Sequence, residues 1–185
     1  MNSKRVRNGL VAAAIAFVAV VAAALLLFFV SGDEADLSYR SVDFDAQLQS
    51  NGDIKFTEHL DYQLKRREND DGDTKPWKQL YLTFKLRNQD LTNITDISVT
   101  NVSTGEQYTQ IAPQPPSGVS DGEWESKYAG HWYIADTTVS PNYPEPFDPA
   151  TDGLDPNGSD NDKQIEIGWN IPATVNQSSL KFDVS

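Results

Sequence analysis

A strict two-residue alternation of apolar and polar side chains constrains the fold of this chain most. In the run 41–48 the apolar residues stand at even positions, and in the run 54–64 they do so again. Successive side chains of a strand point to opposite faces of a sheet, so this period predicts strands with one buried face. Asn51-Gly52 lies between the two runs and is a strong signal for a hairpin turn. The sequence therefore predicts a long β-hairpin.

The sequence after residue 64 repeats this alternation in shorter runs. Alternating or strand-like runs cover residues 80–86, 94–102, 107–111, 131–138, 165–171 and 180–184. After Val30, no run keeps a 3.6-residue apolar period for more than a turn or two. About seven to eight strands, each with one buried face, predict an all-β fold, an antiparallel β-sandwich. An acidic, proline-rich loop at 140–162 is predicted to be flexible.

An uncharged segment places the chain at a membrane. Residues 9–30 hold 22 residues without a charge, and as a helix they would span about 33 Å, close to the hydrocarbon thickness of a bilayer. Lys4, Arg5 and Arg7 precede the segment, and by the positive-inside rule the N-terminus stays in the cytoplasm. We expect a basic tail at 1–8, a transmembrane anchor at 9–30, a linker at 31–37 and an extracytoplasmic domain at 38–185. A cleaved signal peptide ending near Ser31 is the alternative.

Charge and composition exclude several classes of function. The chain carries a net charge of −12 and contains no cysteine. The three cations before residue 8 leave 12 lysines and arginines against 27 acids in the remainder. A nucleic-acid partner is therefore not expected, because phosphate neutralisation needs a basic surface. Without cysteine the chain has no disulfides, thiolate metal ligands or cysteine nucleophile.

Three segments carry a resemblance to a known family. They are the hairpin SVDFDAQLQSNGDIKFTEHLDYQL (41–64), a strand end at Ile97-Ser98-Val99, and QIEIGWNIPATVNQSSLKFDVS (164–185). In these segments the chain resembles the N-terminal extracytoplasmic domain of the YciQ-like predicted membrane proteins of bacteria, a domain of unknown function. The resemblance implies an export segment before the β-domain and further transmembrane helices after it, so the natural protein is expected to continue beyond Ser185. It implies no catalytic residue.

Glu58 and the histidines are the most conspicuous ionisable positions. Glu58 falls on the apolar face of its run, between Phe56 and Leu60. A buried carboxylate needs a partner, a proton or a local bulge, and pairing with a backbone amide, a lysine or an arginine is the favoured interpretation. His59 and His131 lack the spacing of zinc or triad motifs and are expected to be structural. No enzyme is expected.

Two weaker patterns suggest ligands. Asp155, Asn157, Asp160 and Asp162 crowd the acidic loop and are candidate Ca²⁺ ligands, although the glycine and the apolar residue of an EF-hand loop are missing. Trp124, Trp132 and Tyr133 are candidates for stacking on a sugar, while core packing explains Trp132 and Tyr133 equally well. The expected function is a non-enzymatic interaction module of the cell envelope with a protein partner. The alternative is a carbohydrate- or calcium-binding module.

Overall fold

The computed structural model describes residues 35–88, 90–159 and 161–185. The predicted tail (1–8) and anchor (9–30), and most of the predicted linker, lie outside the described residues. Within the described part of the chain, no helix is long and apolar enough to cross a membrane. The compact unit described below is Asp36–Ser185.

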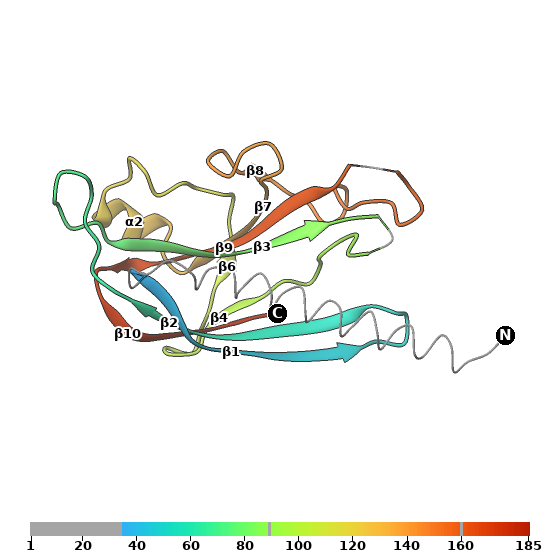
Figure 1. Cartoon of the computed structure of the whole chain (residues 1–185), viewed down its shortest axis with the longest axis horizontal. Helices are drawn as coiled ribbons and strands as arrows, with labels where there is room; N and C mark the ends of the chain where they lie inside the picture. The colour runs from blue at the N-terminus through green and yellow to red at the C-terminus, as the bar shows by residue number, and fades with distance from the viewer. Residues whose placement is uncertain (1–34, 89, 160) are drawn as a thin grey trace. The chain divides into compact units, whose positions relative to one another are not determined.

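The described residues form two β-sheets and one short helix (Figure 1). The first sheet has the order β1-β2-β10-β4-β5, and the second has the order β3-β9-β7-β6, with β8 added to β7. The elements are β1 Leu37–Leu48, β2 Ile54–Leu64, β3 Trp77–Leu86, β4 Val99–Asn101, β5 Glu106–Gln107, β6 Thr109–Gln110, α2 Asp121–Lys127, β7 His131–Asp136, β8 Glu145–Pro146, β9 Lys163–Thr174 and β10 Gln177–Val184.

The strands confirm the predicted class of fold and change its details. All strand pairs are antiparallel except β6 with β7, which is parallel. The described residues contain ten strands rather than seven or eight, because β5, β6 and β8 are additional short strands of two residues each. Such short strands are held by their neighbours and leave no alternation in the sequence.

One apolar core lies between the sheets. Tyr62 of the first sheet contacts Trp169 of the second, with ring centroids 6.2 Å apart, and Phe182 lies 5.5 Å from the same indole. All three side chains are fully or almost fully buried. Aromatic rings of this size each bury about 150–250 Å², and these rings are the largest fully buried side chains of the core between the sheets.

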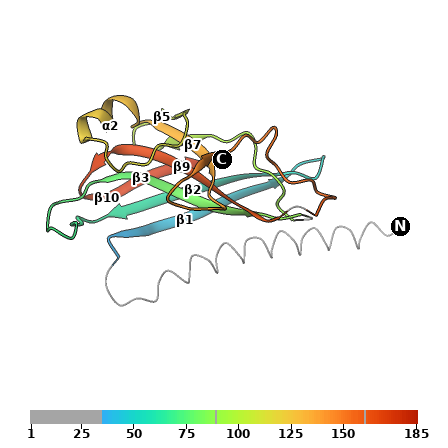
Figure 2. The same cartoon turned by 90° about the horizontal axis from the view of Figure 1, so that it is seen from above.

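The short helix α2 was not predicted. Ser120 caps its first turn by accepting a hydrogen bond from the Glu123 N–H, and Trp124 is its buried residue. The Trp124 indole N–H donates to the carbonyl oxygen of Ile171 in β9 at 2.9 Å, which places the helix at one end of the second sheet (Figures 1 and 2). A single buried residue gives no helical period that the sequence could reveal.

The acidic loop 140–162 is anchored to the domain at several points. β8 lies within it and pairs with the end of β7. Phe147 and Leu154 are buried in the core, and the Leu154 N–H donates to the carbonyl oxygen of Thr92 at 2.8 Å. Its flexibility stays a prediction for the stretches between these anchors.

Candidate functional site

The β1–β2 hairpin forms as the alternation predicts. Its strands pair from Leu37↔Leu64 to Leu48↔Ile54 with one irregularity, between Tyr39 and Ser41. At the turn Gly52 has a φ of +99°, a conformation that glycine adopts without the clash of a Cβ atom. The Asn51 amide donates to the Asp53 carboxylate at 2.7 Å. The turn residues thus fix the register of the whole hairpin.

The tip of the hairpin extends past the neighbouring strand. The pairing of β10 with β2 reaches Val184, which lies opposite Glu58, and Figure 1 shows the hairpin continuing beyond this point. The inner face of the tip is apolar and partly open to solvent. The Phe44 and Phe56 rings stack 5.5 Å apart, and Leu48 and Ile54 are 58% and 48% exposed. Exposed apolar patches of this kind are typical of interaction sites.

His59 ties three strands together on the outer face of the same hairpin. Its Nδ1 lies 2.7 Å from Asp183 Oδ1 of β10, and its Nε2 lies 3.2 Å from Asp45 Oδ2 of β1. Hydrogen bonds to Asp183 and then to Asp45 raise the pKa of His59 above its ordinary value. In the sequence, His59 stands at a polar position of the alternating run, and residue spacing assigns it no partner. The contact was missed because it depends on the register of β10 with β2, which residue spacing does not contain.

Replacing His59 by glutamine is expected to lower stability at acidic pH and to leave it unchanged at alkaline pH. The folded pKa of His59 is raised, so its stabilising charge is fully present below the unfolded pKa and is lost as the pH rises through the folded pKa. The ring is 40% exposed, and solvent screening keeps the effect below about 1 kcal/mol. Urea unfolding at pH 5.5 and pH 9 measures the loss of stability. An equal loss of unfolding free energy at both pH values would contradict a charged interaction of His59 with Asp183 and Asp45.

Glu58 is buried on the inner face, where the alternation puts it. It is 5% exposed, and burial raises its pKa to about 7. Among the described residues its carboxylate makes no ion pair or hydrogen bond, so the partner expected from the sequence is not found. Burial raises the pKa values of the neighbouring Tyr39 and Tyr62, and the charge of Glu58 adds a smaller contribution in the same direction. A carboxyl group in such surroundings is accommodated best in its neutral form.

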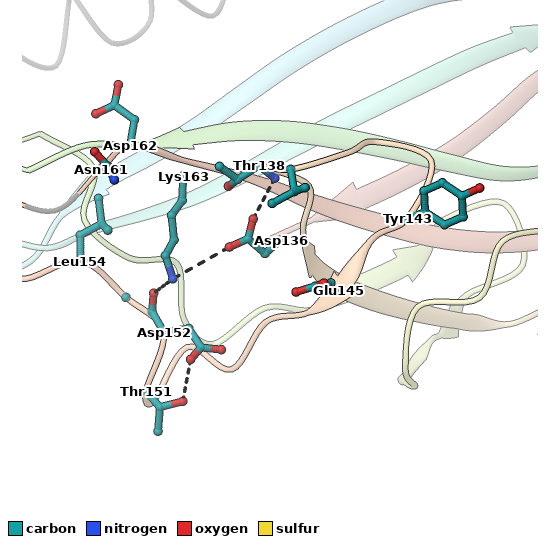
Figure 3. Close-up of a pocket in the computed structure, with 12 residues that line it drawn as sticks. Asp136, Thr138, Tyr143, Glu145, Thr151, Asp152, Leu154, Asn161, Asp162 and Lys163 are labelled. Atoms are coloured by element: carbon teal, nitrogen blue, oxygen red, sulfur yellow. Dashed lines mark hydrogen bonds and ion pairs between the residues drawn. The ribbon is translucent and has the colours of Figure 1, made fainter.

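A shallow cleft lies over the acidic loop (Figure 3). It has a volume of about 500 Å³ and is lined by residues of β7, β8 and the loop, among them Asp136, Glu145 and Asp152. The Lys163 Nζ enters this acidic lining, donates to the carbonyl oxygen of Asp152 at 2.8 Å and lies 3.9 Å from Asp136 Oδ2. Part of the negative charge of the cleft is therefore already compensated by Lys163.

The described Ca²⁺ candidates have separate partners in the structure. Asp155 accepts a hydrogen bond from the Asn157 N–H at 2.8 Å, which closes a local turn. Asp162 pairs with Lys85 at 2.9 Å and Arg87 at 3.5 Å, and the hydrogen bond to Lys85 lowers its pKa. Asp160 lies outside the described residues. In the described ranges, no group of three acidic or histidine side chains is placed to hold a metal ion, and the Ca²⁺ site at Asp155, Asn157, Asp160 and Asp162 stays a prediction.

The sugar-stacking candidates are buried. Trp124 and Tyr133 are 0% and 1% exposed, and Trp132 is 7% exposed and belongs to the core between the sheets. Tyr133 lies on the opposite face of the second sheet, where its hydroxyl donates to Glu166 Oε1 at 2.5 Å. Buried rings offer no surface to a sugar, so the sugar-stacking interpretation is corrected: core and sheet packing explain these three residues.

His131 also has a structural environment. Its Nδ1 lies 3.0 Å from the carbonyl oxygen of Ala129 and 3.2 Å from that of Tyr128. These contacts hold the ring at the start of β7, just after helix α2. Backbone carbonyl oxygens therefore occupy Nδ1 and fix the orientation of the ring.

Comparison with known proteins identifies the family. Residues 38–185 match the family described as "Predicted membrane protein (DUF2207) N-terminal domain", which confirms the resemblance stated from the hairpin and the C-terminal strands. No curated protein and no solved structure matches the chain. The match covers most of the sequence, and the chain belongs to the DUF2207 family of predicted membrane proteins, as its N-terminal domain of unknown function.

Proposed function

We propose that this protein is a membrane-anchored, non-enzymatic interaction module of the cell envelope. The segment 9–30 is its uncleaved anchor, and the β-sandwich 38–185 lies on the extracytoplasmic side. Membership in a family of predicted membrane proteins supports the membrane association. The charge distribution around the uncharged segment supports the orientation, with cations before it and acids after it.

One observation carries the interaction role: the β1–β2 hairpin presents an apolar face and an open strand edge at the same place. The phenylalanine pair at the tip is partly exposed, and Leu48 and Ile54 are exposed beside it. β1 is the terminal strand of the first sheet and, in the described residues, pairs with β2 and no other strand. We assign this hairpin as the surface that a protein partner contacts.

The non-enzymatic role agrees with the surroundings of the polar side chains. Both histidines are engaged by carboxylates or backbone carbonyl oxygens. In the acidic cleft, Lys163 is held by Asp152 and Asp136.

The absence of cysteine makes a direct test available in cells. Single cysteines are introduced at Gln47, beside the hairpin tip, and at Ser117, an exposed loop position away from it. A membrane-impermeant maleimide is expected to label both positions on intact cells. A maleimide photo-crosslinker is expected to give a discrete protein adduct from Gln47→Cys and none from Ser117→Cys.

The two readouts test the two halves of the proposal. Labelling that appears only after cell lysis would overturn the extracytoplasmic location. Adducts that are absent from Gln47→Cys, or equally strong from both cysteines, would overturn the interaction role of the hairpin.

A further inference from the structure

The edge of β1 is regular over residues 41–48, and no other described strand pairs with it. The irregularity between Tyr39 and Ser41 lies at its beginning, and from Ser41 to Leu48 the register is continuous. Exposed edges are normally blocked by charged side chains, above all lysine, by proline or by a bulge. Residues 41–48 contain no lysine, proline or bulge, and their charges are those of Asp43 and Asp45. The other long edge strand, β3, carries Lys78 and Lys85. β1 is thus the edge more open to strand addition.

The backbone direction of β1 follows from the hairpin turn. The Gln49 N–H donates to the carbonyl oxygen of Asp53 at 2.7 Å. Hydrogen-bonded pairs alternate in an antiparallel ladder, so Leu48 and the residues at every second position before it turn their N–H and C=O groups away from β2. These are the backbones of residues 42, 44, 46 and 48.

The other side of β2 gives the same direction independently. The Val102 N–H donates to the carbonyl oxygen of Lys181, so Lys181 faces β4 and its neighbour Phe182 faces β2. Phe182 pairs with Leu60, and Leu60 pairs with Val42 of β1. The backbone N–H and C=O groups of Leu60 therefore bond to β10 and not to β1. Val42, which lies opposite Leu60, consequently directs its own N–H and C=O groups to the open edge.

The side chains along this edge separate by chemistry. Those on the inner face are apolar and are Val42, Phe44, Ala46 and Leu48. Those on the outer face include Asp43 and Asp45, both exposed. An added strand would therefore place every second side chain against an apolar row and the intervening ones beside carboxylates.

Charge decides which strand fits the edge. In a pairing of two β1 strands centred on Phe44, Asp43 of one copy would face Asp45 of the other, and like charges directly opposite are destabilising. The chain's net charge of −12 adds to this repulsion. A strand with basic residues at the positions beside Asp43 and Asp45 gains attraction instead.

We propose that the edge of β1 from Ser41 to Leu48 binds an extended segment of a protein partner, in which basic residues alternate with apolar ones, as an added strand of the first sheet. This inference rests on the proposed interaction role of the hairpin and names the chemistry of the partner. Main-chain hydrogen bonds supply the affinity of such a complex, and alternate side chains supply its specificity.

The test uses the full chain in detergent micelles and fluorescent synthetic peptides long enough to span residues 41–48. One peptide alternates lysine and valine, a second has the same composition in two blocks, and a third alternates glutamate and valine. Anisotropy titrations are expected to give the alternating lysine peptide an affinity at least about tenfold above either control. Hydrogen exchange is expected to slow at the Phe44 and Ala46 amides.

Two variants separate strand addition from charge attraction. Ala46→Pro removes an outward N–H without removing a bond to β2, and it is expected to weaken binding at least about tenfold, whereas Ala46→Thr keeps the N–H and the affinity. Asp43→Lys is expected to remove most of the preference for the lysine peptide over the glutamate peptide, because the new lysine offsets the charge of Asp45. Near-UV circular dichroism shows whether each variant is folded. If Ala46→Pro does not fold, the peptide preference of Asp43→Lys and the exchange rate of the Phe44 amide test strand addition instead.

Several results would overturn this inference. Equal binding of the blocked and alternating peptides would mean unspecific attraction between opposite charges. Unchanged affinity in folded Ala46→Pro would exclude the edge, and a concentration-dependent dimer without peptide binding would mean that a second copy occupies it. If the peptides fail while Gln47→Cys still gives a specific adduct in cells, the hairpin remains an interaction surface and the proposed strand chemistry is wrong.

Discussion

Gly168→Ala is expected to destabilise the domain by about 2–5 kcal/mol, from overpacking and from damage to a buried hydrogen bond. Gly168 lies in β9, opposite Tyr81 of β3 and Tyr133 of β7. The Tyr133 ring covers the glycine so closely that a Cβ atom there would overlap the phenol carbon and oxygen. The ring cannot move freely, because Tyr133 is 1% exposed and its hydroxyl is bonded to Glu166.

A double-mutant cycle identifies the clash. The Tyr133→Ala variant alone loses packing and the hydrogen bond, but it also vacates the space over Gly168. The combination Gly168→Ala/Tyr133→Ala is therefore expected to be more stable than the sum of the two single losses predicts. Urea denaturation of the four proteins measures this coupling. Strict additivity, or a Gly168→Ala protein as stable as the parent, would contradict the contact.

Glu58→Gln is expected to remove most of the pH dependence of stability between pH 5 and 8. The pKa of Glu58 rises from 4.5 to about 7 on folding, so the folded state holds a proton that the unfolded state releases. Stability is therefore highest below the unfolded pKa, falls as the pH rises toward 7, and then levels off. A shift of this size corresponds to about 3 kcal/mol.

His59 is the control for this measurement, because it also loses stabilising charge as the pH rises. In the His59→Gln background, the Glu58 effect is expected to persist, and the double variant His59→Gln/Glu58→Gln is expected to show the flattest profile. Unfolding free energies from urea titrations at half-unit pH steps provide the comparison. A parent protein with constant stability over this range, or a Glu58→Gln protein with an unchanged slope, would show that the carboxyl group is solvated.

The long strands were predictable because each buries one face against the core. β1, β2 and β10 alternate in the sequence as they do in the structure. β9 differs from these strands because both of its faces are buried, including Glu166, Gly168 and Asn170 on the outer face. Its alternation predicts a half-exposed strand, and neighbours distant in sequence, such as Tyr133, provide the cover. The order of residue types along β9 does not reveal that side chains of other strands bury its outer face.

The candidate site was predictable in part, for a similar reason. The hairpin and the inward position of Glu58 follow from period and turn chemistry alone. The contacts of His59 with Asp45 and Asp183 need the order of strands in the sheet, and the burial of Trp124 needs the docking of α2 on β9. Acidic residues close in sequence, such as Asp155 and Asp162, diverged because local turns and nearby cations engage them separately.

The position of β10 has a consequence for the order in which the domain folds. This strand lies between β2 and β4, although about 75 residues of sequence separate it from β4. Until residues 177–184 are present, the N-terminal hairpin and the middle of the chain have no strand to join them into one layer. A polypeptide that emerges N-terminus first therefore leaves this layer incomplete until residues 177–184 have been made.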